Sequence, residues 1–312
     1  MKSLLFRTGQ ILCLLLFLLM IFHSGQVLSF AKDGLRAWAL CVLPVLLPFI
    51  ILSKFWIYYK IPELFLRSGE KLFPENKKLA VCLPVFIIGL CCGFPIGAVF
   101  ISHLYEQHAF SKEEAESLLP LVSFVSPAFL AGYVRPMIEI RGRLWIWFLL
   151  SLYAPVIISF IIMMQTCKDR TSHSDRLRHF SKSPENPASL RKVWLSSLEI
   201  IFTIGIYMML FSILSGLLTN ISLFQTPLPT FLVSNLEITA GIRLLCRCGL
   251  FGKTGLIILS AAATAFGGFC TMAQIHSVVC DSGLSMKKYI ISKAKTSLLT
   301  LVFCLIIFRI LT

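Results

Sequence analysis

The sequence is poor in charge, and acidic residues are especially scarce. Only 14% of the 312 residues are charged, and 15 Asp and Glu stand against 29 Lys and Arg. The hydrophobic share of 57% and the mean hydropathy of +0.83 exclude an ordinary soluble domain, because long apolar stretches are typical of membrane spans. The net charge of +14 does not indicate nucleic-acid binding, since the basic residues lie mostly between apolar segments. That distribution fits the positive-inside bias and attraction to anionic lipid.

The chain also lacks the motifs of a catalytic or metal centre. It has no nucleophile elbow, no paired metal-binding carboxylates and no phosphate loop. His103, His108 and His276 are scattered, and Cys246 and Cys248 have no second pair at a zinc-like spacing. Most of the 11 cysteines lie inside apolar segments, where a free cysteine behaves as a small hydrophobe. We therefore expect no enzymatic activity, no cofactor and no metal.

Long apolar runs dominate the chain and predict an all-α, polytopic transmembrane protein. Most are close to the ~20 residues that a spanning helix needs. Residues 1–31 also have the basic start and apolar centre of a secretory signal, but the spans that follow favour a retained signal-anchor helix over a cleaved signal. The apolar segments lie at about residues 10–30, 35–59, 79–101, 118–134, 144–165, 193–220, 228–250, 254–280 and 296–311.

One long polar stretch at 168–192 separates two halves of similar size. It contains seven Lys and Arg residues against three acidic ones, so we assign it to the cytoplasm. The predicted organisation is a first transmembrane half at 1–167, a basic linker at 168–192 and a second transmembrane half at 193–312.

A helix breaker interrupts the third apolar segment at Gly93-Phe94-Pro95-Ile96-Gly97. Proline removes a backbone donor and glycine is a poor helix former, and in lipid the freed backbone groups must find partners or line a polar cavity. If 79–101 is a re-entrant hairpin, fifteen Lys and Arg residues of the first half and the linker lie on the cytoplasmic side of the membrane and five lie on the other side. If 79–101 spans the membrane, the basic linker lies on the non-cytoplasmic side. The positive-inside bias therefore favours the hairpin, and each of its arms is too short to span the membrane. An ordinary kinked span is the alternative.

The second half contains a weak echo of this break. A shift of 174 residues places Gly93 on Gly267 and Ser111 on Ser285, and so predicts a second broken helix at 254–280. Interrupted segments at corresponding places in two halves are typical of transporters built from inverted repeats. The distribution of Lys and Arg favours an arrangement in which residues 228–250 span the membrane. The symmetry of an inverted repeat favours an arrangement in which residues 228–250 do not span it. We give symmetry the greater weight.

The candidate substrate site begins at the first break. Pro95 is expected in the first turn of the second arm, whose N-terminus would then point free N–H groups and a partial positive charge at the membrane interior. Such an end suits an anionic group such as a carboxylate. Gly93 and Gly97 would let backbone or substrate approach closely. Ser126 interrupts the next apolar segment, where its hydroxyl faces either a polar cavity or its own helix.

The second half supplies further members of this candidate substrate-binding set. Glu237 lies within an apolar segment, where a carboxylate is a candidate proton carrier, cation ligand or partner of arginine; an interfacial position is the alternative. Gln274 offers an amide either to a substrate or to a neighbouring helix. Gly267 and Gly268, at the second break, complete the set.

Two blocks of short motifs carry a family resemblance. The first comprises residues 93–98 (GFPIGA), 111–119 (SKEEAESLL) and 126–127 (SP), and the second comprises residues 236–241 (LEITAG), 266–269 (FGGF) and 273–274 (AQ). In this order, and over nearly the whole chain, they resemble the sporulation integral membrane protein family called YlbJ or SpoVV. One departure precedes residue 126, where the family usually has an Asn-rich run and this chain has Ser123-Phe124-Val125. If those amides touch substrate, specificity here differs.

The resemblance implies a protein with nucleoside-transporter-like gate repeats, made in the mother cell during endospore formation and inserted in the outer forespore membrane. The implied activity is movement of dipicolinic acid, a small aromatic dianion that suits half-helix N-termini, toward the forespore. The expected partners are a small anionic substrate and the lipid bilayer, with no nucleic acid; a homo-oligomer is left open. The alternatives are a non-transporting membrane scaffold for spore assembly and a transporter of a nucleoside-like solute.

Overall fold

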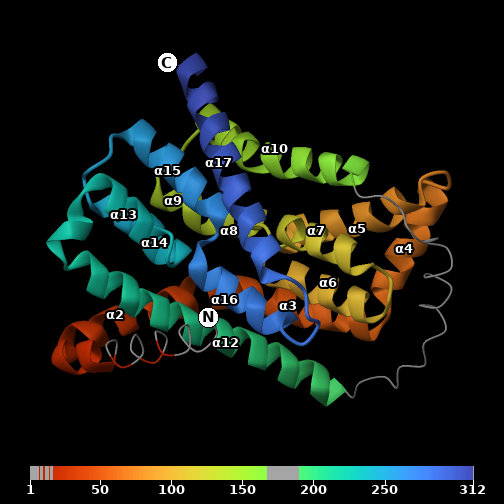
Figure 1. Cartoon of the computed structure of the whole chain (residues 1–312), viewed down its shortest axis with the longest axis horizontal. Coiled ribbons are helices and arrows are strands. Elements are labelled where there is room, and N and C mark those ends of the chain that lie inside the picture. Colours follow the sequence, from red (N-terminus) through yellow and green to blue (C-terminus); the bar gives the residue numbers. More distant parts are fainter. Residues whose placement is uncertain (1–6, 8–9, 11–13, 15–16, 167–189, 312) are drawn as a thin grey trace.

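The computed structural model describes the whole chain except residues 1–6, 8–9, 11–13, 15–16, 167–189 and 312, and within the described part it contains helices and no strand (Figure 1). This confirms the predicted all-α polytopic membrane architecture. The prediction for residues 1–31 falls partly, and the linker at 168–192 almost wholly, outside the described residues. Six described stretches are long and apolar enough to cross a membrane, namely Ser24–Tyr58, Lys112–Met137, Arg143–Thr166, Leu190–Thr219, Lys253–Val279 and Met286–Arg309.

The first of these stretches is one long helix in three pieces: α2 (Ser24–Ala37), the π-helical turn η1 (Trp38–Val42) and α3 (Leu43–Tyr58). No loop divides it, so from Ser24 onward the segment predicted at 10–30 is continuous with the one predicted at 35–59. The long helix α12 (Leu190–Thr219) packs along α2 and α3, and Trp38 Nε1 donates to the carbonyl oxygen of Ile201 at 3.0 Å. In Figure 1, α2 and α12 lie along the lower side of the molecule.

The first half then forms a hairpin followed by a broken helix. After α4 (Ile61–Leu72), the helices α5 (Lys77–Cys92) and α6 (Ile96–Glu106) pack against each other, joined by residues 93–95, which we call tip 1. Neither helix of the hairpin reaches the ~20 residues of a span. The next helix, α7 (Lys112–Val122), stops at residues 123–126, which we call break 1. The chain continues through α8 (Pro127–Phe129), η2 (Leu130–Val134) and α9 (Arg135–Met137) to α10 (Arg143–Thr166).

The second half repeats this pattern. After η3 (Ser222–Gln225), the helices α13 (Pro227–Ser234) and α14 (Ile238–Arg247) form a second hairpin, joined by residues 235–237, which we call tip 2. The next helix, α15 (Lys253–Phe266), stops at residues 267–268, which we call break 2, and α16 (Gly268–Val279) continues it. The final long helix is α17 (Met286–Leu311).

The repeat has a different register from the one that the sequence echo predicted. Adding 142 to the residue number carries the start of α6 at Ile96 onto the start of α14 at Ile238, and brings the starts of α7 and α10 to within one residue of those of α15 and α17. Tip 1 therefore corresponds to tip 2, and not to Gly267 as the shift of 174 has it. The physical reason is that the two halves repeat the positions at which helices start and break, while Gly-Phe-Pro in one tip is matched by Asn-Leu-Glu in the other.

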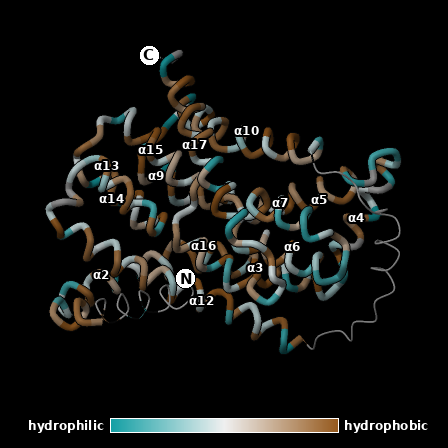
Figure 2. The backbone as a smooth tube through the Cα atoms, in the orientation of Figure 1, coloured by the Kyte–Doolittle hydropathy of each residue, from teal (hydrophilic) through white to brown (hydrophobic). Residues whose placement is uncertain are grey.

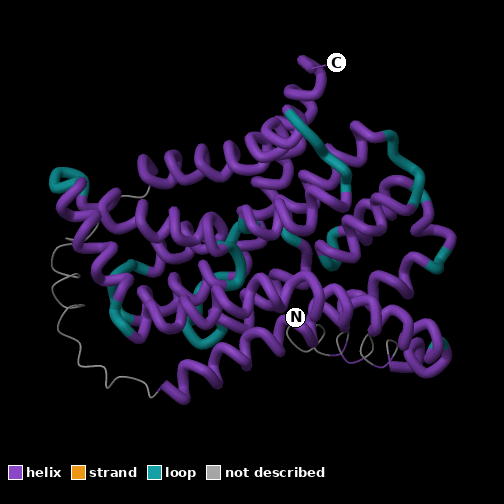
Figure 3. The backbone as a smooth tube through the Cα atoms, turned by 180° about the vertical axis from the view of Figure 1, so that it is seen from behind, coloured by secondary structure: helices purple, strands orange, loops and turns teal. Residues whose placement is uncertain are grey.

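The two hairpins enter the molecule from opposite sides. Figure 1 shows α5 and α6 on the right, α13 and α14 on the left, and α8 and α16 near the middle. Figure 3 shows loop segments (teal) inside the body of the molecule as well as at its ends. The segment at 228–250 is a hairpin of two short helices, as repeat symmetry requires, whereas 254–280 is a broken helix and not a second hairpin.

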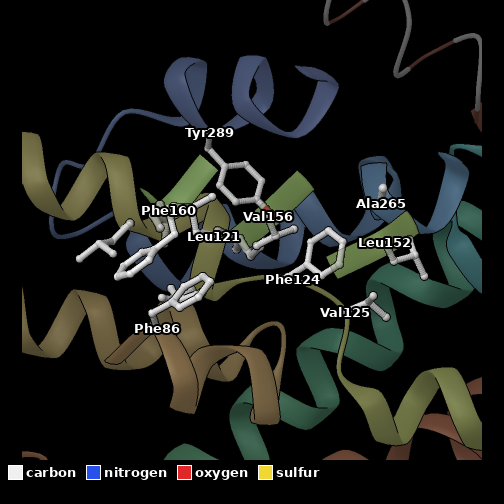
Figure 4. Packing of buried hydrophobic residues seen from close by; sticks show 14 of the residues in the cluster. Phe86, Leu121, Phe124, Val125, Leu152, Val156, Phe160, Ala265 and Tyr289 are labelled. Atoms are coloured by element: carbon white, nitrogen blue, oxygen red, sulfur yellow. The ribbon is translucent and has the colours of Figure 1, made fainter. Parts of the chain in front are cut away.

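Apolar side chains cover both the interior and the outer face of this bundle. In the core, Phe86 of α5 stacks on Phe160 of α10 with ring centroids 4.1 Å apart (Figure 4). The same α10 exposes Ile158, Ile161 and Ile162 on its outer side, and apolar colour runs along most of its length in Figure 2. An exposed apolar face on a helix of this length is a surface that lipid covers.

Candidate substrate site

Three consecutive carbonyls of break 1 accept hydrogen bonds from three different elements. The carbonyl of Ser123 accepts from the Lys293 ammonium of α17 at 3.2 Å. The carbonyl of Phe124 accepts from the N–H of Phe94 in tip 1 at 3.0 Å, and that of Val125 accepts from the Tyr153 hydroxyl of α10 at 3.0 Å. The break is thus a fixed feature, because an unpaired buried carbonyl costs free energy comparable to a lost hydrogen bond.

Break 2 is joined to tip 2 in the corresponding way. The N–H groups of Phe269 and Cys270, in the first turn of α16, donate to the carbonyls of Asn235 and Leu236 at 2.9 and 2.8 Å. Each hairpin tip is therefore bonded through its backbone to the broken helix that follows it. These bonds also use N–H groups of the α16 N-terminus.

Glycines make the close approach at tip 1 possible. Gly93 has φ = 73°, and a Cβ there would lie 2.8 Å from the nitrogen of Ser126. A Cβ on Gly97 would lie only 2.1 Å from the carbonyl oxygen of Val122, at the end of α7. Pro95 directly precedes the first residue of α6. Gly93 and Gly97 thus allow a close approach, as predicted, and the group that comes close to them is the backbone of α7 and break 1.

Both tips, break 1 and the helix α16 that follows break 2 meet around one small cavity of about 30 Å³. Tip 1 contributes Phe94, break 1 contributes Ser126, and tip 2 contributes Glu237. Beyond break 2, Thr271 and Gln274 of α16 complete its polar lining, and α3, α12 and η1 supply apolar side chains. A cavity of this size holds a water molecule and no larger solute.

A much larger cleft of about 430 Å³ lies beside this cavity. Pro95 lines the cleft, and Gln274 and Ile204 line both spaces, so these two side chains form the partition between them. The ionisable side chains of the cleft are Lys54, His103, Glu106, Glu199 and Asp281. With histidine neutral, three carboxylates stand against one ammonium, so the cleft is net acidic.

Glu237 is buried and caps its own helix. Its carboxylate accepts hydrogen bonds from the N–H groups of Thr239 and Ala240 at 2.9 and 2.7 Å and from the Thr239 hydroxyl. Only 2% of the residue is exposed, so the carboxylate lies in the protein interior. The carboxylate occupies the N-terminus of α14, where its charge is stabilised by the helix dipole.

Lys293 is a residue of this region that the sequence analysis did not single out. Its side chain is 1% exposed, its ammonium lies 4.6 Å from the ring centroid of Phe124, and its Cε lies 3.8 Å from a Cβ built on Gly267. It therefore touches break 1 and break 2 together. Tyr289, Lys293, Thr296 and Thr300 recur every three or four residues, and that helical spacing of polar residues is the signal that could have revealed the buried face.

The predicted site residues fall into two groups. Ser126, Glu237 and Gln274 line the small cavity, and Pro95 lines the cleft beside it. Gly93, Gly97, Gly267 and Gly268 line neither space but allow the tips and breaks to pack; a Cβ on Gly268, for example, would lie 3.3 Å from the carbonyl oxygen of Asn235. Among the described residues, no group of three or more His, Cys, Asp or Glu is placed to hold a metal ion.

Fold and site together define a polytopic α-helical membrane protein with two hairpin-and-broken-helix units. No protein-family model matches the chain, and no solved structure matches it. The chain is 24% identical over 326 aligned residues to the sporulation integral membrane protein YlbJ of Bacillus subtilis (strain 168), an alignment that covers 92% of this chain and 79% of that protein. The similarity to this sporulation membrane protein extends over nearly the whole chain and supports the resemblance carried by the motifs.

Proposed function

We propose that the protein is a solute transporter whose substrate binds where the two hairpin tips and the two broken helices meet. The observation that carries this proposal is the convergence of both tips, break 1 and α16, all distant in sequence, on one cavity that has polar side chains among its apolar lining. Irregular backbone at membrane depth is tolerated where it is buried in protein or lines a cavity, and it marks substrate sites in transporters of repeat architecture. A membrane scaffold has no need of such a site.

Transport in this scheme uses the partition between the cavity and the cleft. The cavity of about 30 Å³ is closed to a solute, while the cleft of about 430 Å³ falls within the usual range of small-molecule sites. Movement of α16, which carries Gln274, relative to α12, which carries Ile204, would join the two spaces. In this scheme the structure represents a state in which the cleft is open and the cavity is closed, which is one of the states that alternating access requires.

Dipicolinate is the substrate that we propose first, on the strength of the YlbJ-like similarity and of the chemistry around the cavity. The N-termini of α6 and α16 point partial positive charge at the middle of the molecule, and the Lys293 ammonium lies behind break 1. The Ser126 and Thr271 hydroxyls and the Gln274 amide are donors for carboxylate oxygens. We also propose the outer forespore membrane as its location, which imaging of a fluorescent fusion during sporulation would test.

A nucleoside-like solute is the second candidate, and the acidic cleft favours it. Three carboxylates against one lysine attract a neutral polar or cationic solute more than a dianion. Glu237, Gln274 and the hydroxyls of the cavity are also groups that bind sugar hydroxyls and base edges.

Counterflow of labelled dipicolinate in liposomes containing the purified full chain tests the proposal. We expect uptake well above that of empty liposomes, and a loss of about tenfold or more in Gln274→Ala, because an unpaired polar group on the substrate is costly. Gln26→Ala is the matched control, since Gln26 is exposed on α2 and bonds to Asn220. Uptake equal to that of empty liposomes contradicts the dipicolinate proposal, and a signal abolished by excess unlabelled nucleoside favours the second candidate.

A further inference from the structure

The strongest feature outside the cavity is the fully buried ammonium of Lys293. It donates to the carbonyl of Ser123, the residue that ends α7 at break 1, and lies over the face of Phe124. In transporters with broken helices, the coupling ion binds at the C-terminal end of a half-helix, where unwound backbone carbonyls coordinate it. Here the side-chain ammonium itself takes that position.

No carboxylate pairs with Lys293 among the described residues. The helix α17 packs against three helices that carry titratable groups. These groups are Lys112, Glu113, Glu114 and Glu116 on α7, Arg143 and Tyr153 on α10, and Lys253 on α15. Glu116 is bonded to Lys288 and to the N–H of Ser285 at the start of α17, and the Tyr153 hydroxyl is bonded to Val125. On α17 itself the titratable groups are Lys287, Lys288, Tyr289, Lys295, Cys304 and Arg309, of which the ring of Tyr289 lies 6.0 Å from the ammonium.

A row of buried hydroxyls leads away from Lys293 between α15 and α17. The two helices run antiparallel: Lys293 lies near Gly267, and the Ser297 hydroxyl donates to the carbonyl of Ala262. This register places Thr296 opposite Thr264 and Thr300 opposite Ser260. The hydroxyls of Ser260, Thr264 and Thr300 are buried and have no hydrogen-bond partner in the described part of the chain, and the same is true of the hydroxyls of Ser123 and Tyr289 beside Lys293. Buried hydroxyls that both donate and accept are the groups that a water chain or a proton relay needs.

We propose that Lys293 is the proton-binding residue that couples transport to protons, and that the row formed by Ser260, Thr264, Thr296 and Thr300 is its proton route. This inference rests on the proposed transport function and adds its driving ion. The step is a single transfer in which the neutral amine takes up one proton and becomes the ammonium that holds break 1. No other bond changes.

Charge linkage gives the direction of coupling. An ammonium buried without a carboxylate carries a desolvation cost, and a bound anion nearby lowers that cost. Ser123 is three residues from Ser126 of the cavity, a separation of at most about 10 Å along the chain. At an effective dielectric constant of about 20, opposite unit charges about 10 Å apart change an equilibrium about tenfold. Anion binding and proton binding therefore strengthen each other, and the transporter carries both in the same direction.

Binding calorimetry of dipicolinate to the purified full chain, in two buffers of different ionisation enthalpy, tests the coupling. We expect proton uptake on binding by the wild type and by Lys295→Met, and none by Lys293→Met, which should bind dipicolinate up to about tenfold more weakly because it lacks the charge. Lys295 is the matched control because it is exposed on the same helix, two residues away. Binding by the wild type without proton uptake, or equal uptake by Lys293→Met, overturns the coupling and leaves the transport proposal standing. No binding at all by the wild type overturns the dipicolinate proposal and the coupling with it.

Liposome transport gives the second readout. An inward proton gradient should raise dipicolinate uptake about tenfold in the wild type and in Lys295→Met, in line with the linkage above. In Lys293→Met the gradient should have no effect, while counterflow, which needs no net proton movement, persists. Gradient-driven uptake by Lys293→Met at the wild-type level overturns the proposal. Persisting counterflow also shows that the variant is folded.

Discussion

Gly97→Ala tests the close approach of α6 to α7 that fixes tip 1 against break 1. The new Cβ would lie 2.1 Å from the carbonyl oxygen of Val122 and 2.6 Å from its carbonyl carbon, whereas real Cβ contacts essentially never fall below 3.0 Å. The neighbour is backbone, so α6 must move away by at least about 0.9 Å, the difference between 3.0 and 2.1 Å. Overpacking of this kind costs about 1–3 kcal/mol. Alanine recovers part of that cost, since glycine inside a helix is destabilising by about 0.5–1 kcal/mol.

The measurement is the apparent midpoint of thermal unfolding in detergent, followed by size-exclusion chromatography of heated samples. A loss of about 2 kcal/mol corresponds to a fall of about 5 °C in a chain of this size. Gly132→Ala is the matched control: Gly132 lies in η2, just beyond break 1, and a Cβ there meets nothing within 4 Å. We expect the control to equal or slightly exceed the wild type. Equal midpoints for the two variants would refute the packing of tip 1 described above.

Three further predictions follow from other contacts. Tyr153→Phe leaves the carbonyl of Val125 without its donor and should cost about 1–3 kcal/mol, seen as a lower unfolding midpoint; an unchanged midpoint contradicts the bond. Glu237→Ala removes the cap of α14 and should lower the midpoint by the equivalent of about 1 kcal/mol, with Glu237→Gln less severe; equal losses would argue against a role for the charge. Glu199→Gln reduces the acidic charge of the cleft and should speed dipicolinate uptake at low salt, with the gain shrinking as salt rises; a salt-independent change would indicate another cause.

Composition was sufficient to predict the architecture, because helices in lipid must satisfy their own backbone groups and so leave long apolar runs in the sequence. Tip 1 was also predictable, since Gly93 and Pro95 stand two residues apart and both residue types weaken a helix. Tip 2 escaped notice because Asn235-Leu236-Glu237 contains neither glycine nor proline. Glu237 caps α14 from inside an apolar run, and a carboxylate there fits a proton carrier as well as it fits a cap.

The repeat register could not be obtained from residue identities. Matching glycine with glycine gives a shift of 174, whereas the helices repeat with a shift of 142, and at that shift Ser126 corresponds to Gly268. The two units keep their fold by pairing tip with break through backbone hydrogen bonds, and backbone bonds leave side chains free to vary. Lys293 was hidden for a related reason: its role depends on α15 and break 1, which are distant in sequence and meet only in the folded chain.

Protection from alkylation tests the central claim, that substrate sits where the tips and breaks meet. In the Ser126→Cys variant, modification of residue 126 and of the exposed native Cys280 is followed separately by mass spectrometry of the same sample. We expect dipicolinate to slow modification at residue 126 several-fold, because a bound solute excludes the reagent, and to leave the rate at Cys280 unchanged. Equal rates at residue 126 with and without dipicolinate, in a sample that binds dipicolinate by calorimetry, would contradict the proposed site.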